Sequence, residues 1–234
     1  MHVDIFIRTY HKDIEWLKYA LASIHKHVKG WRKIIITIPE GQGQLLSHLT
    51  AETVIEVEDM QDGYIGQQLT KMEAWKYTDA DCVLFWDSDV IATEPIDIRT
   101  EYFKQGKPIL YKTRYSSLPG CQWKGITEKA VGFDVEWEYM RRMPIIHLRE
   151  TLIDCYSFVE SVVKMPLGEY LEAQPNRAFS EFNVIGVVAD LSAWDGYSIL
   201  DTESIDMPPN KVYQGWSWGG LTPEVREVIN KALA

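Results

Sequence analysis

The stretch CVLFWDSDVI, residues 82–91, decides the fold of this chain, because an apolar run stops abruptly at two carboxylates. Residues 82–86 are apolar without a break, which is typical of a strand covered on both faces of a parallel sheet. A carboxylate inside such a strand would be costly to desolvate, so Asp87 and Asp89 are expected just past its end. In an extended segment, side chains two residues apart project to the same side. We therefore expect these two acids to converge while Ser88 points away.

The Asp-x-Asp pattern occurs twice, and the other copy, Asp79 and Asp81, lies in a polar turn before the apolar run. A strand over residues 82–86 spans about 17 Å, so the upstream pair is expected at the opposite edge of the sheet, in solvent. Open α/β sheets bind ligands at the carboxyl ends of their strands, and carboxylate oxygens suit hard divalent cations. The sequence thus predicts a metal site at Asp87 and Asp89. The alternative is that these acids only cap the following turn.

Strands and helices alternate along the first half of the chain. Short β-branched or aromatic runs predict strands at residues 3–7, 33–38, 53–57, 82–86 and 108–112. Apolar residues at three- and four-residue steps predict amphipathic helices over residues 14–28 and 64–77. This alternation predicts the α/β class: a single-domain Rossmann-like fold whose central sheet is mostly parallel and flanked by helices.

The second half of the chain is less regular. Residues 116–144 carry glycines and prolines among aromatic side chains, which predicts an irregular, aromatic-rich excursion. Further on, the pattern predicts a helix over residues 148–162, a strand over residues 184–189 and a final helix capped by Thr222.

The composition fits one domain. The chain has 234 residues and 46% of them are hydrophobic, which is enough for one α/β core. No linker or repeat interrupts the pattern, so we expect a single domain over residues 1–234, with a regular half at 1–114 and a less regular half at 115–234. No apolar stretch approaches the length of a membrane span and no apolar leader opens the sequence, so a cytoplasmic protein is expected.

Charge and cysteine content exclude some classes. The formal net charge of −10 argues against a broad nucleic-acid footprint. The only basic concentration is either a local patch or a solvated helix face; it consists of Arg141, Arg142, His147, Arg149 and Lys164. The three cysteines, at positions 82, 121 and 155, show no paired spacing and are expected to be reduced.

Three motifs at strand ends carry a resemblance to a known family. Arg8-Thr9-Tyr10 ends the first strand, Asp87-Ser88-Asp89 ends the fourth, and Ser180-Glu181 precedes a later apolar segment. With the alternating elements, this order resembles the single-domain nucleotide-sugar glycosyltransferases of the A-type fold (GT-A), in particular bacterial and viral members. The resemblance implies a hexosyltransferase-like enzyme that takes a sugar from a nucleotide-sugar donor, by family frequency a UDP-hexose. It also implies Mn²⁺ or Mg²⁺ at the Asp-x-Asp (DXD) motif.

The resemblance assigns roles to the two acids. Asp89 is the expected direct metal ligand, while Asp87 would hold the ribose hydroxyls or a metal-bound water. A third ligand in this family often comes from a histidine near the C-terminus, but residues 212–220 contain none. Gln214 or water would take that place, or the metal dependence is weak.

Other residues are expected to bind the donor. Arg8, Thr9 and Tyr10 would meet the base and ribose, although ordinary turn packing would also explain them. The segment over residues 63–71 combines glycines, which allow close backbone approach, with a polar helix face, and both suit a nucleotide or its phosphates. The alternative is a solvated helix face. The expected binding residues are Gly63, Tyr64, Gln67, Gln68 and Lys71, with Ser88 beside the acids. Trp216 and Trp218 lie among glycines and could stack on sugar rings.

Glu181, between two phenylalanines, is the candidate general base if the transfer inverts the anomeric centre. In a retaining enzyme it would orient the acceptor or stabilise positive charge on the sugar. Asp206 and Asp134 are the alternative bases. The resemblance implies that residues 1–114 bind the nucleotide-sugar, and that residues 115–234 form the acceptor half and a C-terminal closing segment. The acceptor itself is expected at the excursion over residues 116–149, with Trp123 and Trp137 as lesser candidates for its binding.

Two other classes of function remain open. A nucleotidyltransferase would share the sheet and the acids, but it usually carries a glycine-rich basic loop after the first strand, and residues 8–12 contain no glycine. The chain could also be a non-catalytic nucleotide-binding assembly subunit. The acceptor would be a glycan or another hydroxyl compound, and a modified DNA base has no support from the acidic balance.

Overall fold

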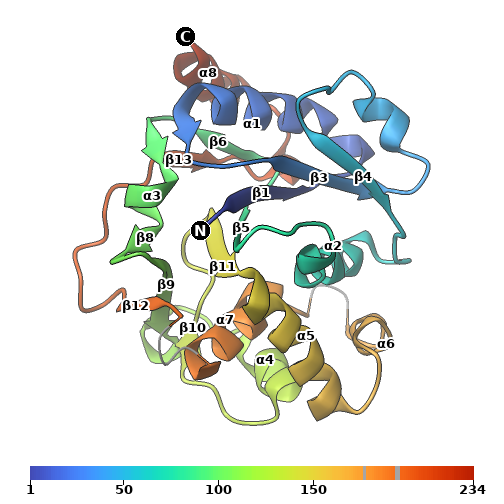
Figure 1. The fold of residues 1–234 in the computed structure, drawn as a ribbon, viewed down its shortest axis with the longest axis vertical. Helices are drawn as coiled ribbons and strands as arrows, with labels where there is room; N and C mark the ends of the chain where they lie inside the picture. The colour runs from blue at the N-terminus through green and yellow to red at the C-terminus, as the bar shows by residue number, and fades with distance from the viewer. Residues whose placement is uncertain (176–177, 193–195) are drawn as a thin grey trace.

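The computed structural model describes residues 1–175, 178–192 and 196–234. Its centre is a five-stranded sheet with the strand order β11-β5-β1-β3-β4 (Figure 1). Within this sheet, β1, β3, β4 and β5 run parallel to one another, whereas β11 joins the edge antiparallel to β5. The bounds are β1 (Val3–Arg8), β3 (Ile34–Pro39), β4 (Thr53–Val57), β5 (Cys82–Phe85) and β11 (Ile145–Leu148). The predicted α/β class with a mostly parallel sheet is confirmed.

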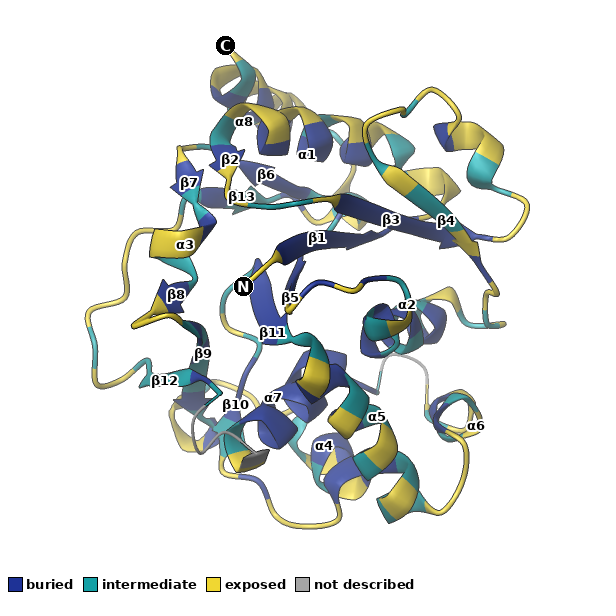
Figure 2. Cartoon of the chain, in the orientation of Figure 1, coloured by how far each residue is buried: buried dark blue, intermediate teal, exposed yellow. Residues whose placement is uncertain are grey.

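One face of the sheet is covered by α1 (Ile14–His27), with α8 (Pro223–Leu233) packed on its outer side (Figure 1). Alternate side chains of each strand project to this face, because successive residues of a strand point in opposite directions. Ile5 and Leu84 therefore share a buried cluster with Leu17 of α1. The helix keeps its polar side toward solvent, as its amphipathic pattern predicts (Figure 2).

The opposite face carries the remaining large helices, which gather below the sheet in Figure 1. Phe6 and Phe85 project into this layer and share a core with Leu152 and Phe182. The helices are α2 (Gly63–Met72), α4 (Lys124–Val131), α5 (Arg149–Val163), α6 (Leu167–Glu172) and α7 (Glu181–Ser192). Elements from both halves of the chain thus share one hydrophobic core.

Small ribbons extend the sheet at its margins. β6 (Val90–Ala92) pairs antiparallel with β13 (Val212–Gln214), which ties the segment after β5 to the C-terminal region. A second small sheet is built on β9 (Lys107–Arg114), with β8 (Phe103–Lys104), β10 (Trp137–Glu138) and β12 (Ser198–Asp201). The short remaining elements are β2 (Val28–Lys29), β7 (Ile96–Asp97), α3 (Ile98–Glu101), and the 3-10 turns His11–Asp13, Gly43–Leu46, Ala74–Lys76, Tyr115–Ser117 and Ser217–Gly219.

The expected strands in the first half are confirmed, but the strand expected over residues 184–189 is wrong. That segment lies inside α7, a helix that is buried on nearly every side. A short, continuously apolar run does not distinguish a buried strand from a buried helix by its periodicity. Gly186 allows the close packing of this helix, because a Cβ there would lie 2.3 Å from the Tyr139 side chain.

The excursion over residues 116–144 is more regular than expected, since it contains α4 and β10. Two of the five basic residues belong to neither a surface patch nor a solvated helix face: His147 is fully buried in the core, and Arg149 donates to the backbone carbonyls of Trp75 and Thr78. All three cysteines are free thiols, with Cys82 and Cys155 buried. Among the described helices, none combines the length and the apolar character that crossing a bilayer requires.

Candidate functional site at the carboxyl ends of the strands

The segment after β5 is a turn and not an extended strand end. β5 stops at Phe85, and the amide of Val90 donates to the carbonyl of Asp87 at 3.1 Å. The buried Trp86 indole fixes this turn by donating to the carbonyl of Val90 at 2.8 Å. The expected extended geometry is therefore wrong, and the two acids point to different partners.

Asp87 pairs with a buried lysine. The Nζ of Lys71, in the last turn of α2, lies 2.8 Å from Oδ1 of Asp87 and 3.1 Å from Oε1 of Glu181. The same ammonium lies 4.8 Å from the centre of the Phe182 ring. Burial alone lowers the pKa of Lys71, but the charges of Asp87 and Glu181 outweigh it and raise that pKa. The two acids thus favour the charged form of Lys71.

Glu181 is the first residue of α7, where its side chain is only 3% exposed. Its amide donates to Oε1 of Gln68 at 2.9 Å, so α2 also fixes the start of α7. Burial raises the pKa of Glu181, Lys71 opposes that shift, and the charge of Asp87 adds to it. Gln68, expected to face a nucleotide, is thus used to position Glu181.

Asp89 is held by the C-terminal loop. Its Oδ2 accepts the amide of Ser217 at 2.8 Å, and its backbone carbonyl accepts the amide of Gly215, also at 2.8 Å. Burial raises the pKa of Asp89 to about 6, and the nearby charges of Asp87 and Asp13 add to this rise. The surroundings of Asp89 therefore carry an excess of negative charge that a bound cation would relieve.

Asp13 is a site residue that the sequence reasoning missed. Asp13 directly precedes α1, yet its side chain makes no capping hydrogen bond there. Instead, its Oδ2 accepts the hydroxyl of Ser88 at 3.3 Å. Burial raises the pKa of Asp13, and hydrogen bonds from Ser217 and Ser88 oppose the rise. The available signal was an acid shortly after the end of the first strand, at the same sheet edge as Asp87.

The end of β1 brings buried polar groups to this edge. The guanidinium of Arg8 pairs with Asp59, with 3.0 Å between Nη2 and Oδ1, and it also donates to the carbonyl of Thr9. Within the described ranges, the Nε of Arg8 and the hydroxyl of Thr9 are buried without a hydrogen-bond partner. Buried polar groups are normally satisfied, so such atoms beside the acids fit a ligand-binding role. Tyr10 follows them at the surface.

Some residues at the start of α2 that were expected to bind a ligand have structural roles instead. Asp62 caps the helix by accepting the amide of Tyr64 at 2.9 Å. Gly66 has a packing reason, because a Cβ there would lie 2.6 Å from the Asp59 carboxylate, whereas a Cβ on Gly63 would meet nothing. The open backbone at Gly63 and the half-buried Gln67 remain available to a ligand.

The C-terminal loop places two tryptophans at the surface beside Asp89. Trp216 is 57% exposed and Trp218 is 81% exposed, and both flank Ser217. Trp216 has a φ of +50°, a left-handed conformation that is rare for a bulky side chain. Gln214 lies in β13, paired with Val90 next to the acids. The structure thus brings the expected loop to the expected strand end.

The remaining candidates lie elsewhere. Trp137 contacts Lys112 and Arg114, whose charged groups lie 4.6 and 4.4 Å from the centre of its ring. Trp123 packs at the margin of the core, while Asp134 and Asp206 lie on exposed segments. None of these residues contacts the acids through an interaction seen in the described part of the chain.

The donor set for a metal ion is incomplete. Within residues 1–175, 178–192 and 196–234, no three His, Cys, Asp or Glu side chains are arranged to hold a metal ion. Asp87 is engaged by Lys71, which leaves Asp89 as the acid best placed to bind a cation. Its carboxylate suits Mg²⁺ or Mn²⁺, which keep several water or phosphate oxygens as ligands.

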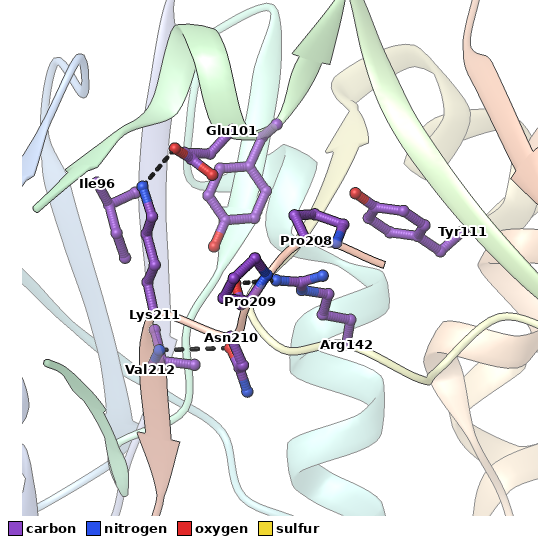
Figure 3. A pocket seen from close by; sticks show the side chains of 10 residues that line it. Ile96, Glu101, Tyr111, Arg142, Pro208, Pro209, Asn210, Lys211 and Val212 are labelled. Atoms are coloured by element: carbon purple, nitrogen blue, oxygen red, sulfur yellow. Dashed lines mark hydrogen bonds and ion pairs between the residues drawn. The ribbon is translucent and has the colours of Figure 1, made fainter. Parts of the chain in front are cut away.

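Two surface pockets are lined by none of these site residues. The first lies between the end of α3 and residues 208–212, and Figure 3 shows Arg142 and Tyr111 on one side of it. There the Nζ of Lys211 pairs with Glu101 at 2.6 Å. The second is an open surface around Trp75 and Arg149, near the start of β5, whereas the acids follow the end of that strand.

Comparisons with known proteins do not assign the chain to a family. A scan against protein-family models finds no match, and neither does a search of the curated proteins.

Proposed function

We propose that this protein is a glycosyltransferase that moves a sugar from a nucleotide-sugar donor to a hydroxyl acceptor. The observation that carries the proposal is the convergence of four acids and one buried lysine at the carboxyl end of β5. Asp87 faces Lys71 and Glu181 on one side, while Asp89 lies with Asp13 and the C-terminal loop on the other. Ligands of open α/β sheets bind at this edge, which supports a donor site there.

The donor would lie across the ends of β1 and β5. The unpartnered Nε of Arg8 and the Thr9 hydroxyl offer hydrogen bonds to a base or ribose, together with Tyr10. Asp89, with water or Gln214, would hold Mg²⁺ or Mn²⁺. When bound, that ion neutralises charge on the diphosphate leaving group. Asp87 is left to the ribose hydroxyls or to a metal-bound water, because Lys71 already engages it. A UDP-hexose is our proposed donor.

The transfer needs an acceptor for one proton. The acceptor hydroxyl oxygen forms a bond to the anomeric carbon, the bond from that carbon to the diphosphate breaks, and its electron pair leaves with the diphosphate. In an inverting reaction, Glu181 takes the hydroxyl proton. Because burial and Asp87 raise the pKa of Glu181, it is a stronger base than a solvated carboxylate. Trp216 and Trp218 are exposed enough to stack on sugar rings.

Ligand-dependent unfolding tests this proposal. UDP with Mn²⁺ at about a hundred times its Kd should stabilise the fold by about 2.7 kcal/mol, measured by thermal denaturation. UDP with a chelator should stabilise it less. Release of UDP from a panel of UDP-hexoses then tests turnover. No stabilisation by any nucleoside diphosphate would contradict a donor site. Stabilisation without turnover of any sugar donor would favour the nucleotide-binding subunit.

A further inference from the structure

Lys71 serves two carboxylates with one ammonium group. Its Nζ lies 2.8 Å from Asp87 and 3.1 Å from Glu181, and the side chains of Lys71 and Glu181 are 4% and 3% exposed. The two carboxylates can both stay ionised here only while the ammonium lies between them, because a buried charge without a partner is strongly unfavourable. The state of Glu181 therefore depends on a residue that lies on another helix.

The other groups around Glu181 do not replace that cation. Asp87 adds negative charge, and Gln68 carries no charge and accepts a hydrogen bond from the backbone amide of Glu181. His147 of β11 stacks on the neighbouring Phe182, but burial lowers the pKa of His147 to about 3, so it is neutral. Several charged side chains on elements that pack against α7 have partners of their own: Glu138 pairs with Arg141, Lys124 with Glu128, and Lys112 with Asp190 at the far end of α7. Arg149 of α5 donates to the backbone carbonyls of Trp75 and Thr78.

We propose that Lys71 is a positioning residue for Glu181, which it holds ionised and fixed beside Asp87. Two contacts from the same helix support this role. The ammonium of Lys71 engages Oε1 of Glu181, and Gln68, one turn earlier, engages its amide. The Phe182 ring of α7 packs against the ammonium, with its centre 4.8 Å from Nζ. The consequence for sugar transfer rests on the proposed function, whereas the effect on Glu181 itself does not.

The sign of the effect follows from the charges. Without the ammonium, Glu181 would be a buried acid next to the like charge of Asp87, and both conditions favour its protonated form. A protonated Glu181 cannot accept a proton from an acceptor hydroxyl. Lys71 would thus act on the reaction through Glu181, and not by touching the sugar.

Carbon-13 NMR of glutamate carboxyl groups measures this directly. Glu181→Gln assigns the Glu181 signal by its disappearance. In Lys71→Met, the titration midpoint of that signal should rise by about two pH units or more relative to the parent protein. Lys71→Arg, which keeps the charge, should move it by less than about one unit. The matched control is Lys76→Met, because Lys76 also pairs with an acid, Glu73 at 2.6 Å, yet it is 39% exposed and lies away from Glu181. It should leave the midpoint unchanged.

An unchanged Glu181 midpoint in Lys71→Met would overturn the proposal. If that variant does not fold, Asp87→Asn gives a second reading. Removing the like charge while Lys71 remains should lower the Glu181 midpoint by about one unit. A midpoint that does not move in this variant would show that the three groups are not coupled, which would also overturn the proposal.

Kinetics separate this role from donor binding. At pH 7, Lys71→Met should lower kcat for release of UDP from its sugar donor by about tenfold or more, with recovery as the pH rises past the new midpoint. A rise in the donor KM with unchanged kcat would place Lys71 on the donor phosphates and contradict the positioning role. A shifted midpoint in a parent protein that turns over no donor would refute the proposed function but not this inference.

Discussion

The two Asp-x-Asp pairs that flank β5 have the same sequence pattern and opposite surroundings. Upstream, Asp79 is 81% exposed and pairs with Arg32, while Asp81 accepts the amide of His2. The hydrogen bond and charge of Arg32 lower the pKa of Asp79. Downstream, Asp89 is mostly buried, and burial together with Asp87 and Asp13 raises its pKa to about 6. One pair is solvated and neutralised, and the other is crowded with like charge.

The difference shows that the strand between the pairs decides their chemistry. Parallel strands deliver Arg8 and Asp87 to the same edge, and the helices and the C-terminal loop supply Lys71 and Ser217 there. At the upstream edge, Asp79 pairs with the half-buried Arg32, and Asp81 lies near the amino group that starts the chain. An Asp-x-Asp motif therefore indicates a binding site only when it follows the carboxyl end of a parallel strand.

The largest expected effect separates the two pairs by function. Asp89→Ala should abolish Mn²⁺-dependent stabilisation by UDP and lower donor turnover by about a thousandfold or more, because it removes the proposed metal ligand. Asp79→Ala is the matched control and should change neither property. Nucleotide titrations monitored by thermal denaturation, with UDP release as the second readout, provide the test. Equal behaviour of the two variants would refute the placement of the site.

The pH dependence of stability should differ in sign between the pairs. The pKa of Asp89 is raised in the folded state, so its contribution is full below pH 4 and is lost as the pH rises through about 6. Asp89→Asn should remove a fall of about 3 kcal/mol in unfolding free energy over that range. The pKa of Asp79 is lowered, so its contribution is present above pH 4 and is lost at more acidic pH. The test is to measure the unfolding free energy of Asp89→Asn and Asp79→Asn by denaturant titration from pH 3 to pH 8. The same change with pH in both variants would contradict this comparison.

A third test concerns the loop that holds Asp89. A Cβ on Gly215 would lie 2.2 Å from the Trp16 ring, so Gly215→Ala should lower the unfolding free energy by about 2 kcal/mol. It should also weaken UDP binding, because the Gly215 amide supports the Asp89 backbone. A Cβ on Gly219 would meet nothing, which makes Gly219→Ala the control. Chemical denaturation and nucleotide titration of both variants should separate them, and equal stability would argue against the Trp16 contact.

The smallest expected effect concerns sugar stacking. Trp218 is 81% exposed, so Trp218→Ala should change stability by less than about 0.5 kcal/mol. If its ring stacks on the donor sugar, the variant should bind a UDP-hexose about two- to tenfold more weakly and UDP itself equally well. Calorimetric titrations with both ligands make the comparison. An equal loss for both ligands would assign Trp218 to the nucleotide instead.

Local sequence pattern predicted the framework well. The strands at residues 53–57 and 82–86, the helix over residues 14–28 and the cap at Thr222 follow from composition and spacing, which neighbouring residues determine. The edge at which Asp87 lies followed from strand direction. The segment over residues 184–189 failed because burial on all sides removes the periodicity that separates a helix from a strand.

The partners within the site could not be predicted. Lys71 was expected to face a ligand, and its pairing with Asp87 and Glu181 depends on how α2 and α7 pack against each other on one face of the sheet. Asp13 was missed because a helix start explains an acid equally well. Long-range packing decides both cases, and a single sequence does not encode it in any local spacing.

The pairing of β6 with β13 also bears on the order in which the protein is completed during synthesis. Asp87 and Asp89, which follow β5, emerge from the ribosome early, but the backbone groups of Gly215 and Ser217 that hold Asp89 emerge much later. Contacts between distant segments form late and slowly, since a long loop must close first. A nascent chain would therefore present the sheet edge with Asp89 unsupported, and the site would mature only when the last strand docks.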